Sequence, residues 1–352
     1  MVILRPITNP PNPYLSTEVA YLPDLPVEER AARLQVFEDH SRTILSENDS
    51  PDLGFRFSAN PYRGCFHACA YCYARPTHQY LGFGAGTDFD RKIIVKPDAA
   101  RLLRQAFERP SWQGELVLFS GVTDCYQPLE ASYRLTRACL EVCLAYRNPV
   151  GIVTKAPLVE RDRDVLAQLA QEASVSVTVS IPLWDVDKAR AIEPYVATPE
   201  RRIGIVAKLA DAGIPVGVNI APMIPGLGDE DMVRTLEAAR AAGASYAGFV
   251  FLRLPGVVAE VFEGRVRESL PLRADKILHK VREARGGKLY NARFGARQHG
   301  EGAYASQAEA LFEATCRRLG LHRGHLAEAA SRTGTFRRPP RSPEPGDQLT
   351  LL

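Results

Sequence analysis

The sequence has no apolar run of about 18 residues, so we expect no helix that spans a membrane. Its first 15 residues contain four prolines and no apolar stretch, which argues against a secretory signal. The seven cysteines are an odd number and four of them stand apart from the other three, which argues against a disulfide framework. We therefore expect a cytoplasmic protein with reduced thiols and a core of ordinary size.

The net charge is also small, +3 over 352 residues, but it is unevenly distributed. Residues 280–341 contain 13 Lys and Arg against 5 Glu and no Asp, a net charge of +8, so the rest of the chain carries −5. This asymmetry indicates either a surface for an anionic partner or a solvated basic face. Four aromatic residues are interleaved with these charges and would serve as stacking sites or as core residues: Tyr290, Phe294, Tyr304 and Phe312.

Strands and helices alternate through the middle of the chain. Residues 175–181 alternate Val or Ile with Ser or Thr, and this period of two indicates a strand. Thr198 and Pro199 form a helix start, and Asp229 is placed to cap the next helix. The other expected strands are residues 115–119, 150–154, 216–221 and 246–252, with one more near 55–60.

Six βα units of this kind predict an α/β barrel or partial barrel with its site at the C-terminal ends of the strands. A doubly wound open sheet is the alternative, although no G-x-G-x-x-G turn follows the first strand. Small polar residues on two strands would face the barrel interior, where they would either line a polar ligand or bond one another. These residues are Ser176, Thr178, Ser180 and Asn219.

The segments that flank the alternating region differ from it in composition. Residues 1–54 are expected to be an N-terminal extension, irregular apart from a helix from Pro26 to about Leu45, and residues 55–255 to be the barrel. A helical, basic C-terminal extension is expected over residues 256–330. Residues 331–352 are rich in Arg, Pro and Ser, which predicts a disordered tail.

Three cysteines, Cys65, Cys69 and Cys72, lie within eight residues and can converge on one soft metal centre. A structural zinc site would need a fourth protein ligand, and His67 is too close in sequence to complete a tetrahedron with all three. A cubane iron–sulfur cluster has four ligand positions, so three thiolates leave one iron open to a substrate or cofactor. The sequence therefore favours a [4Fe–4S] cluster with an active role.

The C-x-x-x-C-x-x-C spacing with the aromatic Tyr71 resembles the signature of the radical SAM superfamily. The resemblance implies a partial (β/α)6 TIM-like barrel with terminal extensions. It also implies that S-adenosylmethionine (SAM) binds the open iron and is cleaved to methionine and a 5′-deoxyadenosyl radical, which abstracts hydrogen from a substrate. Further motifs resemble the spore photoproduct lyase-related bacterial group often labelled DNA repair photolyase: residues 60–65, 72–76, 122–124, 126–128 and 154–155.

The resemblance implies roles for individual residues. Asp124 would accept from the SAM amino group, or else cap a turn, and Lys155 would meet the SAM carboxylate, or else solvent. Cys125 is a candidate hydrogen donor, although in the lyase we expect the loop cysteine to precede the matching residues, and a plain loop thiol is the alternative. The implied cluster ligands are Cys65, Cys69 and Cys72, and the implied SAM contacts are Tyr71, Gly121, Thr123, Asp124, Lys155, Ser180, Asn219 and Ile224.

Three functions remain open on the sequence alone. The first is a radical SAM enzyme that acts on nucleic acid, supplied by an electron donor such as flavodoxin or ferredoxin. The second keeps the radical chemistry but acts on a protein or small molecule. The third is a non-catalytic metal-binding module, which would carry zinc and form no 5′-deoxyadenosine.

Overall fold

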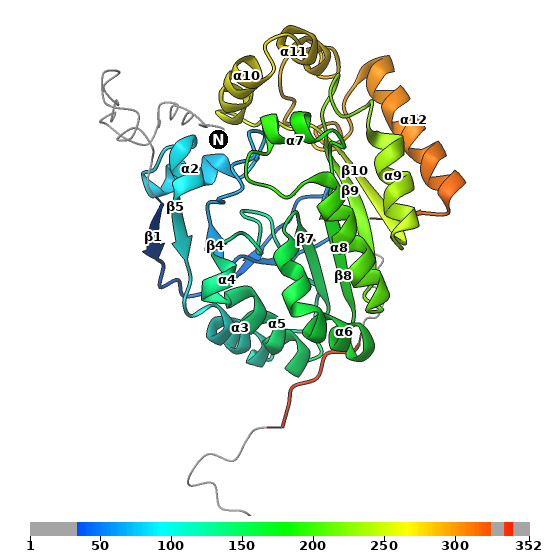
Figure 1. Cartoon of the computed structure of the whole chain (residues 1–352). Coiled ribbons are helices and arrows are strands. Elements are labelled where there is room, and N and C mark those ends of the chain that lie inside the picture. Colours follow the sequence, from blue (N-terminus) through cyan, green and yellow to red (C-terminus); the bar gives the residue numbers. More distant parts are fainter. Residues whose placement is uncertain (1–33, 325–333, 341–352) are drawn as a thin grey trace, which may run out of the picture.

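The computed structural model describes residues 34–324 and 334–340 and contains an α/β fold built on a parallel sheet (Figure 1). Its eight strands lie in the order β11-β10-β9-β8-β7-β6-β3-β2, so six consecutive parallel strands follow the chain without reversal. A doubly wound sheet would reverse its order part-way, so that alternative is wrong. The six strands are β3 (Phe57–Ala59), β6 (Val117–Phe119), β7 (Val150–Thr154), β8 (Val175–Ser180), β9 (Val216–Met223) and β10 (Tyr246–Phe251).

Helices follow the strands and cover the outer face of the sheet (Figure 1). The apolar stripes read from the sequence form their buried sides, and the Thr198 hydroxyl accepts from the Arg201 amide at 3.3 Å as an N-cap. Asp229 does not cap the next helix; its carboxylate accepts from the Tyr304 hydroxyl at 2.6 Å instead. These helices are α3 (Ala99–Glu108), α5 (Leu135–Ala145), α6 (Arg163–Glu172), α8 (Pro199–Asp211) and α9 (Met232–Ala241).

The sheet does not close into a full barrel, because β2 (Leu45–Glu47) and β11 (His322–Arg323) are its two edges. Residues that are far apart in the sequence contact each other between the first and last strands of this sheet. The Asp52 carboxylate accepts from the Arg297 Nε at 2.6 Å and from the Gly295 amide at 2.8 Å. The partial barrel predicted from the resemblance is the observed architecture.

The polar strand residues in the lower part of the barrel bond a tyrosine. The Tyr246 ring lies over Gly217, where an added Cβ would approach the ring to 2.2 Å. Its hydroxyl lies 3.0 Å from the Thr178 hydroxyl and donates to the Val177 carbonyl at 2.9 Å. The Tyr246 ring therefore occupies part of the lower interior, and Ser180 and Asn219 lie at the C-terminal ends of β8 and β9.

The N-terminal extension contains strands where a helix was predicted. The segment from Pro26 to residue 33 lies outside the described residues, but β1 (Gln35–Glu38) and β2 replace the rest of that helix. β1 pairs with β5 (Lys92–Val95), which pairs with β4 (Tyr62–Arg63), so the segment forms a second, three-stranded sheet. The helix prediction was wrong because apolar residues in a short segment fit either period until a partner strand is known.

The described part of the C-terminal extension contains three helices, and residues 334–340 of the expected tail pack against the core. α10 (Val258–Ser269) and α11 (Ala274–Glu283) lie beyond the end of β10, and α12 (Gly302–Leu319) packs beside α9 (Figure 1). Phe336 stacks on Tyr146 with centroids 6.2 Å apart, and Arg338 donates to the Phe107 carbonyl at 3.1 Å. Residues 334–340 are therefore packed, and the rest of the predicted tail lies outside the described residues. None of the helices in the described part of the chain is long and apolar enough to cross a membrane.

Shorter elements complete the C-terminal side of the sheet. They are η1 (Arg75–Leu81), α2 (Thr87–Arg91), α4 (Glu130–Tyr133), η2 (Pro157–Asp162) and α7 (Val186–Ile192). η1 begins three residues after Cys72 and carries the buried His78. The His78 Nε2 lies 2.8 Å from the Lys92 carbonyl and must donate, so Nδ1 is the unprotonated nitrogen, and it has no partner among the described atoms.

We expect His78 to make the fold sensitive to acid. Burial lowers the pKa of His78 to about 4, because a second proton would place a buried N–H without an acceptor. The unfolded chain takes up this proton near pH 6.5, so stability present above that pH is lost as the pH falls toward 4. The free energy of unfolding should therefore drop between pH 7 and pH 5. The drop should be smaller in His78→Gln, which keeps the donor, and unchanged in His40→Gln, whose side chain is 70% exposed.

Candidate active site

The three clustered cysteines lie on a loop of successive tight turns after β4. The carbonyls of Cys65, Cys69 and Cys72 each accept from the amide three residues further on, at 3.2 Å. Burial raises the pKa of the Cys65 thiol to about 12 and that of Cys69 well above its usual range. The charge of Cys72 raises the pKa of Cys65, and the charges of Cys65 and Cys72 raise that of Cys69. Buried thiols of this kind are poor nucleophiles, and only a bound metal would hold them as thiolates.

The donor set fits an iron–sulfur cluster better than a single ion. In the described part of the chain, no three His, Cys, Asp and Glu side chains are arranged to hold one metal ion. In a cubane each thiolate binds a different iron, so the sulfurs need not meet at one point. His67 does not complete a zinc site, because its Nδ1 lies 3.5 Å from the Asp124 carboxylate.

A buried arginine braces the middle of the cysteine loop. Arg75 donates through Nε and Nη2 to the Cys69 carbonyl at 3.1 and 2.9 Å. Its other bonds reach the Ala85 and Gly86 carbonyls and the Asp90 carboxylate, each at 2.9 Å. Because the guanidinium is fully buried and all these acceptors are protein groups, Arg75 fixes the loop rather than contacting a substrate.

The loop after β6 holds the start of the cysteine loop. The Thr123 hydroxyl donates to the Gly64 carbonyl at 2.6 Å, and the Gln127 amide donates to the same oxygen at 3.3 Å. The side-chain oxygen Oε1 of Gln127 accepts from the Phe66 backbone amide at 3.2 Å. Gly121 has a φ of +120°, which favours glycine at this bend. The structure thus gives Thr123 a protein partner where the sequence assigned it to SAM.

Asp124 ties this loop to the end of β7. Its carboxylate accepts from the Tyr126 amide at 2.9 Å, the Thr154 hydroxyl at 2.7 Å and the Lys155 amide at 2.8 Å. The contact with Tyr126 is the turn that the sequence left as the alternative. With three protein donors and His67 nearby, the carboxylate has little capacity left for a SAM amino group.

Lys155 is the exception among these charged groups. Within the described residues its ammonium makes no hydrogen bond or ion pair, and it lies 5.7 Å from the centroid of the Tyr71 ring. Burial lowers the pKa of Lys155, but the negative charges of Cys69, Glu193 and Asp124 outweigh it, so the net shift is upward. A half-buried, charged lysine without a bonded anion fits the carboxylate of a ligand.

The remaining predicted contacts lie at the ends of the strands. Ser180 ends β8 opposite Asn219 of β9, and the Asn219 Oδ1 is buried with no hydrogen-bond partner in the described structure. Ile224 is fully buried in the apolar cluster that contains Cys69 and Tyr71. An unsatisfied amide oxygen beside an apolar wall suits a ligand with hydroxyl groups and a flat ring.

Residues 59–239 match the family described as the Radical SAM superfamily, which is more than half of the chain. The matched range contains the cysteine loop and all of the strand ends described above. The chain belongs to the radical SAM superfamily. The radical SAM domain supplies the fold and the site, and the segments outside residues 59–239 flank it.

The curated relatives are uncharacterized proteins. One, from Mycobacterium tuberculosis (strain ATCC 25618 / H37Rv), is 40% identical over 206 residues, 58% of this chain and 61% of the relative. Another, from Methanocaldococcus jannaschii, is 29% identical over 202 residues, 57% of this chain and 73% of the relative. The chain thus spans about three fifths of the length of the mycobacterial relative.

Solved structures of spore photoproduct lyase share this radical SAM fold. A lyase complexed with dinucleoside spore photoproduct has a TM-score of 0.58 at 17% identity and covers 82% of this chain and 81% of its own. A lyase variant with bound AdoMet and the same dinucleoside has a TM-score of 0.59 at 17% identity, over 88% and 86%. At this identity the likeness shows the fold, and the chemistry of the present chain must come from its own residues.

Sequence reasoning missed a buried ion pair beside the radical SAM site. The Tyr71 hydroxyl donates to Glu193, whose other oxygen accepts from the Arg202 Nη2 at 2.7 Å. Arg202 also donates to the Ser180 carbonyl at 2.9 Å. Both charged side chains are fully buried, so the pair connects the cysteine loop to the ends of β8 and α8. Arg202 lies on the same face of α8 as the buried apolar residues. An arginine at such a position was the signal in the sequence for this buried ion pair.

Cys125 lies away from the site. Its side chain is fully buried in the main core, and its thiol is 3.7 Å from the Phe119 carbonyl. Burial raises the pKa of Cys125 well above its usual range. The expected role as a hydrogen donor therefore finds no support in the structure, since the thiol faces the core rather than an open space.

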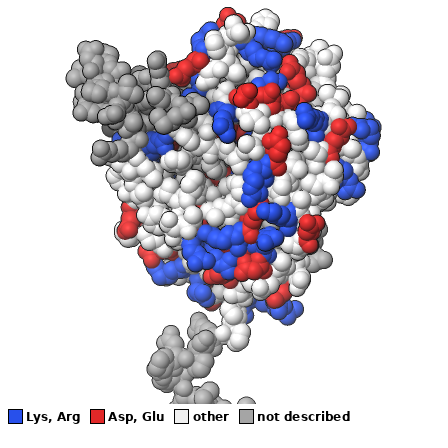
Figure 2. Space-filling model, viewed as in Figure 1, with Lys and Arg blue, Asp and Glu red and all other residues white. Residues whose placement is uncertain are grey.

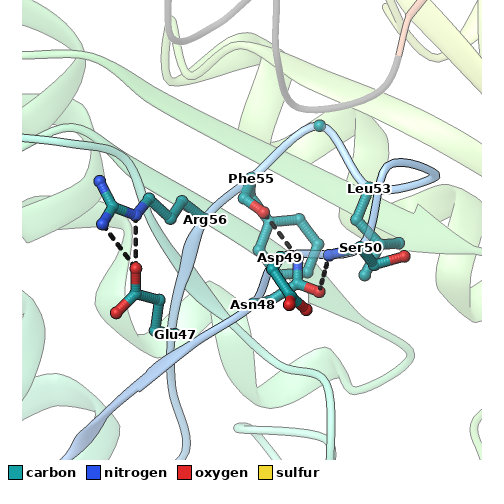
Figure 3. Close-up of a pocket in the computed structure, with 8 residues that line it drawn as sticks. Glu47, Asn48, Asp49, Ser50, Leu53, Phe55 and Arg56 are labelled. Atoms are coloured by element: carbon teal, nitrogen blue, oxygen red, sulfur yellow. Dashed lines mark hydrogen bonds and ion pairs between the residues drawn. The ribbon is translucent and has the colours of Figure 1, made fainter.

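A surface pocket at the turn between β2 and β3 is separate from these residues. Its lining includes Asn48, Ser50 and Arg56, and Figure 3 shows Arg56 directed toward Glu47. This turn precedes β3, so it lies at the N-terminal end of that strand, whereas the cysteines follow its C-terminal end. The pocket carries no group that would serve catalysis, and we assign it no role.

Proposed function

We propose that this chain is an enzyme that cleaves SAM with a [4Fe–4S] cluster on Cys65, Cys69 and Cys72 and abstracts hydrogen from a nucleic-acid substrate. The observation that carries the proposal is the presence of the unpaired ammonium of the half-buried Lys155 beside the loop that holds the buried Cys65 and Cys69 and the half-buried Cys72. A structural metal site would have no need of a partly buried cation without a counter-ion at its side. A ligand that carries a carboxylate accounts for both features.

Each residue has a defined task in this proposal. When bound and reduced, the cluster supplies the electron that breaks a carbon–sulfur bond of SAM. Lys155 holds the SAM carboxylate, while Ser180 and the unsatisfied Asn219 Oδ1 bond the ribose. Tyr71 and Ile224 provide the apolar surface beside the adenine. Thr123, Asp124 and Gly121 do not contact SAM in this proposal. They hold the backbone of the loop after β6 in place, whereas the sequence predicted direct contacts with SAM.

Support for a nucleic-acid substrate comes from the lyase likeness and from the basic C-terminal segment. Phe312 is fully buried and Tyr304 bonds Asp229, so neither serves as a stacking site. Phe294 is 61% exposed and lies under the Arg297 guanidinium, 4.4 Å away, as a stacking residue would. On the face shown in Figure 2, positive and negative side chains are intermixed.

The wider organisation is proposed on the same basis. The barrel over residues 55–255 carries the SAM chemistry, residues 1–54 flank it, and residues 256–330 contact the substrate. The protein would work in the cytoplasm, where a flavodoxin or ferredoxin can deliver one electron at a time.

The test is SAM cleavage by anaerobically purified protein reconstituted with iron and sulfide and reduced with dithionite. We expect 5′-deoxyadenosine, with faster formation when damaged DNA or RNA is added. A protein that retains zinc and forms no product in any of these mixtures would refute the enzymatic proposal. Product that responds to a metabolite or peptide but not to nucleic acid would refute the substrate class alone.

Lys155→Met should weaken SAM binding while the cluster still assembles. Methionine keeps the apolar stem but loses the charge, and a hydrogen bond to a charged group contributes about 2 kcal/mol, or roughly 30-fold in affinity. Equilibrium binding of SAM to the reconstituted protein measures this change. Lys208→Met, on a side chain that is 50% exposed, is the matched control and should bind SAM normally.

A further inference from the structure

Arg253 lies two residues after the end of β10, at the C-terminal end of the sheet, where a substrate would enter. Its Nε is buried and has no hydrogen-bond partner. Among the described residues the guanidinium makes no hydrogen bond or ion pair, and its carbon lies 5.5 Å from the centroid of the Tyr73 ring. An arginine that buries part of its guanidinium without any acceptor is costly unless another molecule provides one.

The electrostatic surroundings of Arg253 make this cost larger. Burial lowers the pKa of Arg285 to about 10, and the nearby charge of Arg253 contributes to this shift, so the two guanidiniums repel each other. Arg285 is held by protein acceptors, because its Nη atoms donate to the carbonyls of Leu252 and Ala296, although its Nε, like that of Arg253, has no partner among the described residues. The charge of Arg253 also lowers the pKa of Asp52, but the Asp52 carboxylate is bonded to Arg297 and to the Gly295 amide.

Tyr73 places this cation beside the reactive centre. It is the residue after Cys72, and 51% of it is exposed, unlike the buried Tyr71. An exposed ring under a guanidinium offers a stacking surface for a base, and the guanidinium offers paired donors for an anion beside that base. Lys155 contacts Tyr71 instead, so the two cations serve different anions.

We propose that Arg253 and Tyr73 form the substrate-binding site, in which the guanidinium bonds one phosphodiester and the ring stacks on the adjoining base. This inference rests on the proposed function, because the site takes its meaning from the neighbouring cysteines. A phosphodiester suits the position better than a peptide carboxylate, because in a nucleic acid each anionic phosphate lies next to a nucleotide with a flat apolar base.

The experiment measures binding of a fluorescent ten-residue oligothymidylate to the reconstituted protein as a function of salt. Arg253→Gln should weaken binding about tenfold and lower the salt slope by about 0.7, the loss of one phosphate contact to a single strand. Arg101→Gln, which removes one charge from the outer helix α3, should leave both unchanged. Arg253→Lys should keep the slope while losing affinity, because an ammonium is a point charge.

Three results separate the possible failures. If Arg253→Gln and Arg101→Gln bind the oligonucleotide equally, the assignment is overturned, whatever the rate of 5′-deoxyadenosine formation without substrate. If a polyglutamate peptide competes as well as an RNA of equal length, the anion is not a phosphodiester and the assignment also falls. If the wild-type protein forms no 5′-deoxyadenosine, the proposed function fails by itself, and the binding comparison still reports on Arg253.

Discussion

A Cys69→Ala variant is expected to lose iron and to form no 5′-deoxyadenosine from SAM above background. The thiol is a cluster ligand in the proposal, and a cubane with two protein ligands would not persist. The fold should survive, because Arg75 holds the Cys69 carbonyl rather than its side chain. Iron content, the visible absorption of the cluster and product formation are measured on the same reconstituted sample.

Cys139→Ala is the matched control for this change. Cys139 is also a buried cysteine, but it lies on α5 within the main core. Its replacement should leave iron content and product formation at wild-type levels. Equal iron loss in the two variants would mean that the effect comes from damage to the fold and not from a lost ligand.

Glu193→Ala is expected to destabilise the fold by about 3–5 kcal/mol, because it leaves the Arg202 guanidinium buried without its counter-ion. Arg202→Met should have a similar effect for the converse reason. The free energy of unfolding from anaerobic urea titration measures both. Glu193→Ala also frees the Tyr71 hydroxyl, so SAM affinity should fall as well in that variant.

The double variant Glu193→Gln, Arg202→Met provides the control. It removes both charges, and the amide oxygen of glutamine still accepts from Tyr71. We expect it to be more stable than either Glu193→Ala or Arg202→Met, because no unpaired charge stays buried. If its loss equals the summed losses of Glu193→Gln and Arg202→Met measured singly, the two side chains do not act as a pair.

The sequence was sufficient for the parts of the fold that local periodicity determines. The alternation of Val175 to Ser180 identified β8, and the start at Thr198 identified α8. The cysteine loop was equally clear, because three thiols in one short segment have few chemical uses. In these places the side-chain pattern and the three-dimensional environment agree.

Long-range contacts explain what the sequence could not supply. β1 depends on pairing with β5, some 55 residues away, and its own residues do not distinguish a strand from a helix. Phe336 packs on Tyr146, but a short segment among prolines and arginines has no periodicity to reveal it. The commitment of Asp124 to Lys155 and Thr154 likewise depends on the register of β6 and β7.

The central claim is that this chain directs a SAM-derived radical at nucleic acid. It is tested most directly by supplying the reduced, reconstituted protein with SAM and uniformly deuterated oligonucleotides, as damaged DNA and as RNA, and by analysing the 5′-deoxyadenosine by mass spectrometry. The account predicts deuterium in the product, carried from the oligonucleotide, and none in the Cys69→Ala sample. Abundant 5′-deoxyadenosine that contains no deuterium with either nucleic acid would contradict it.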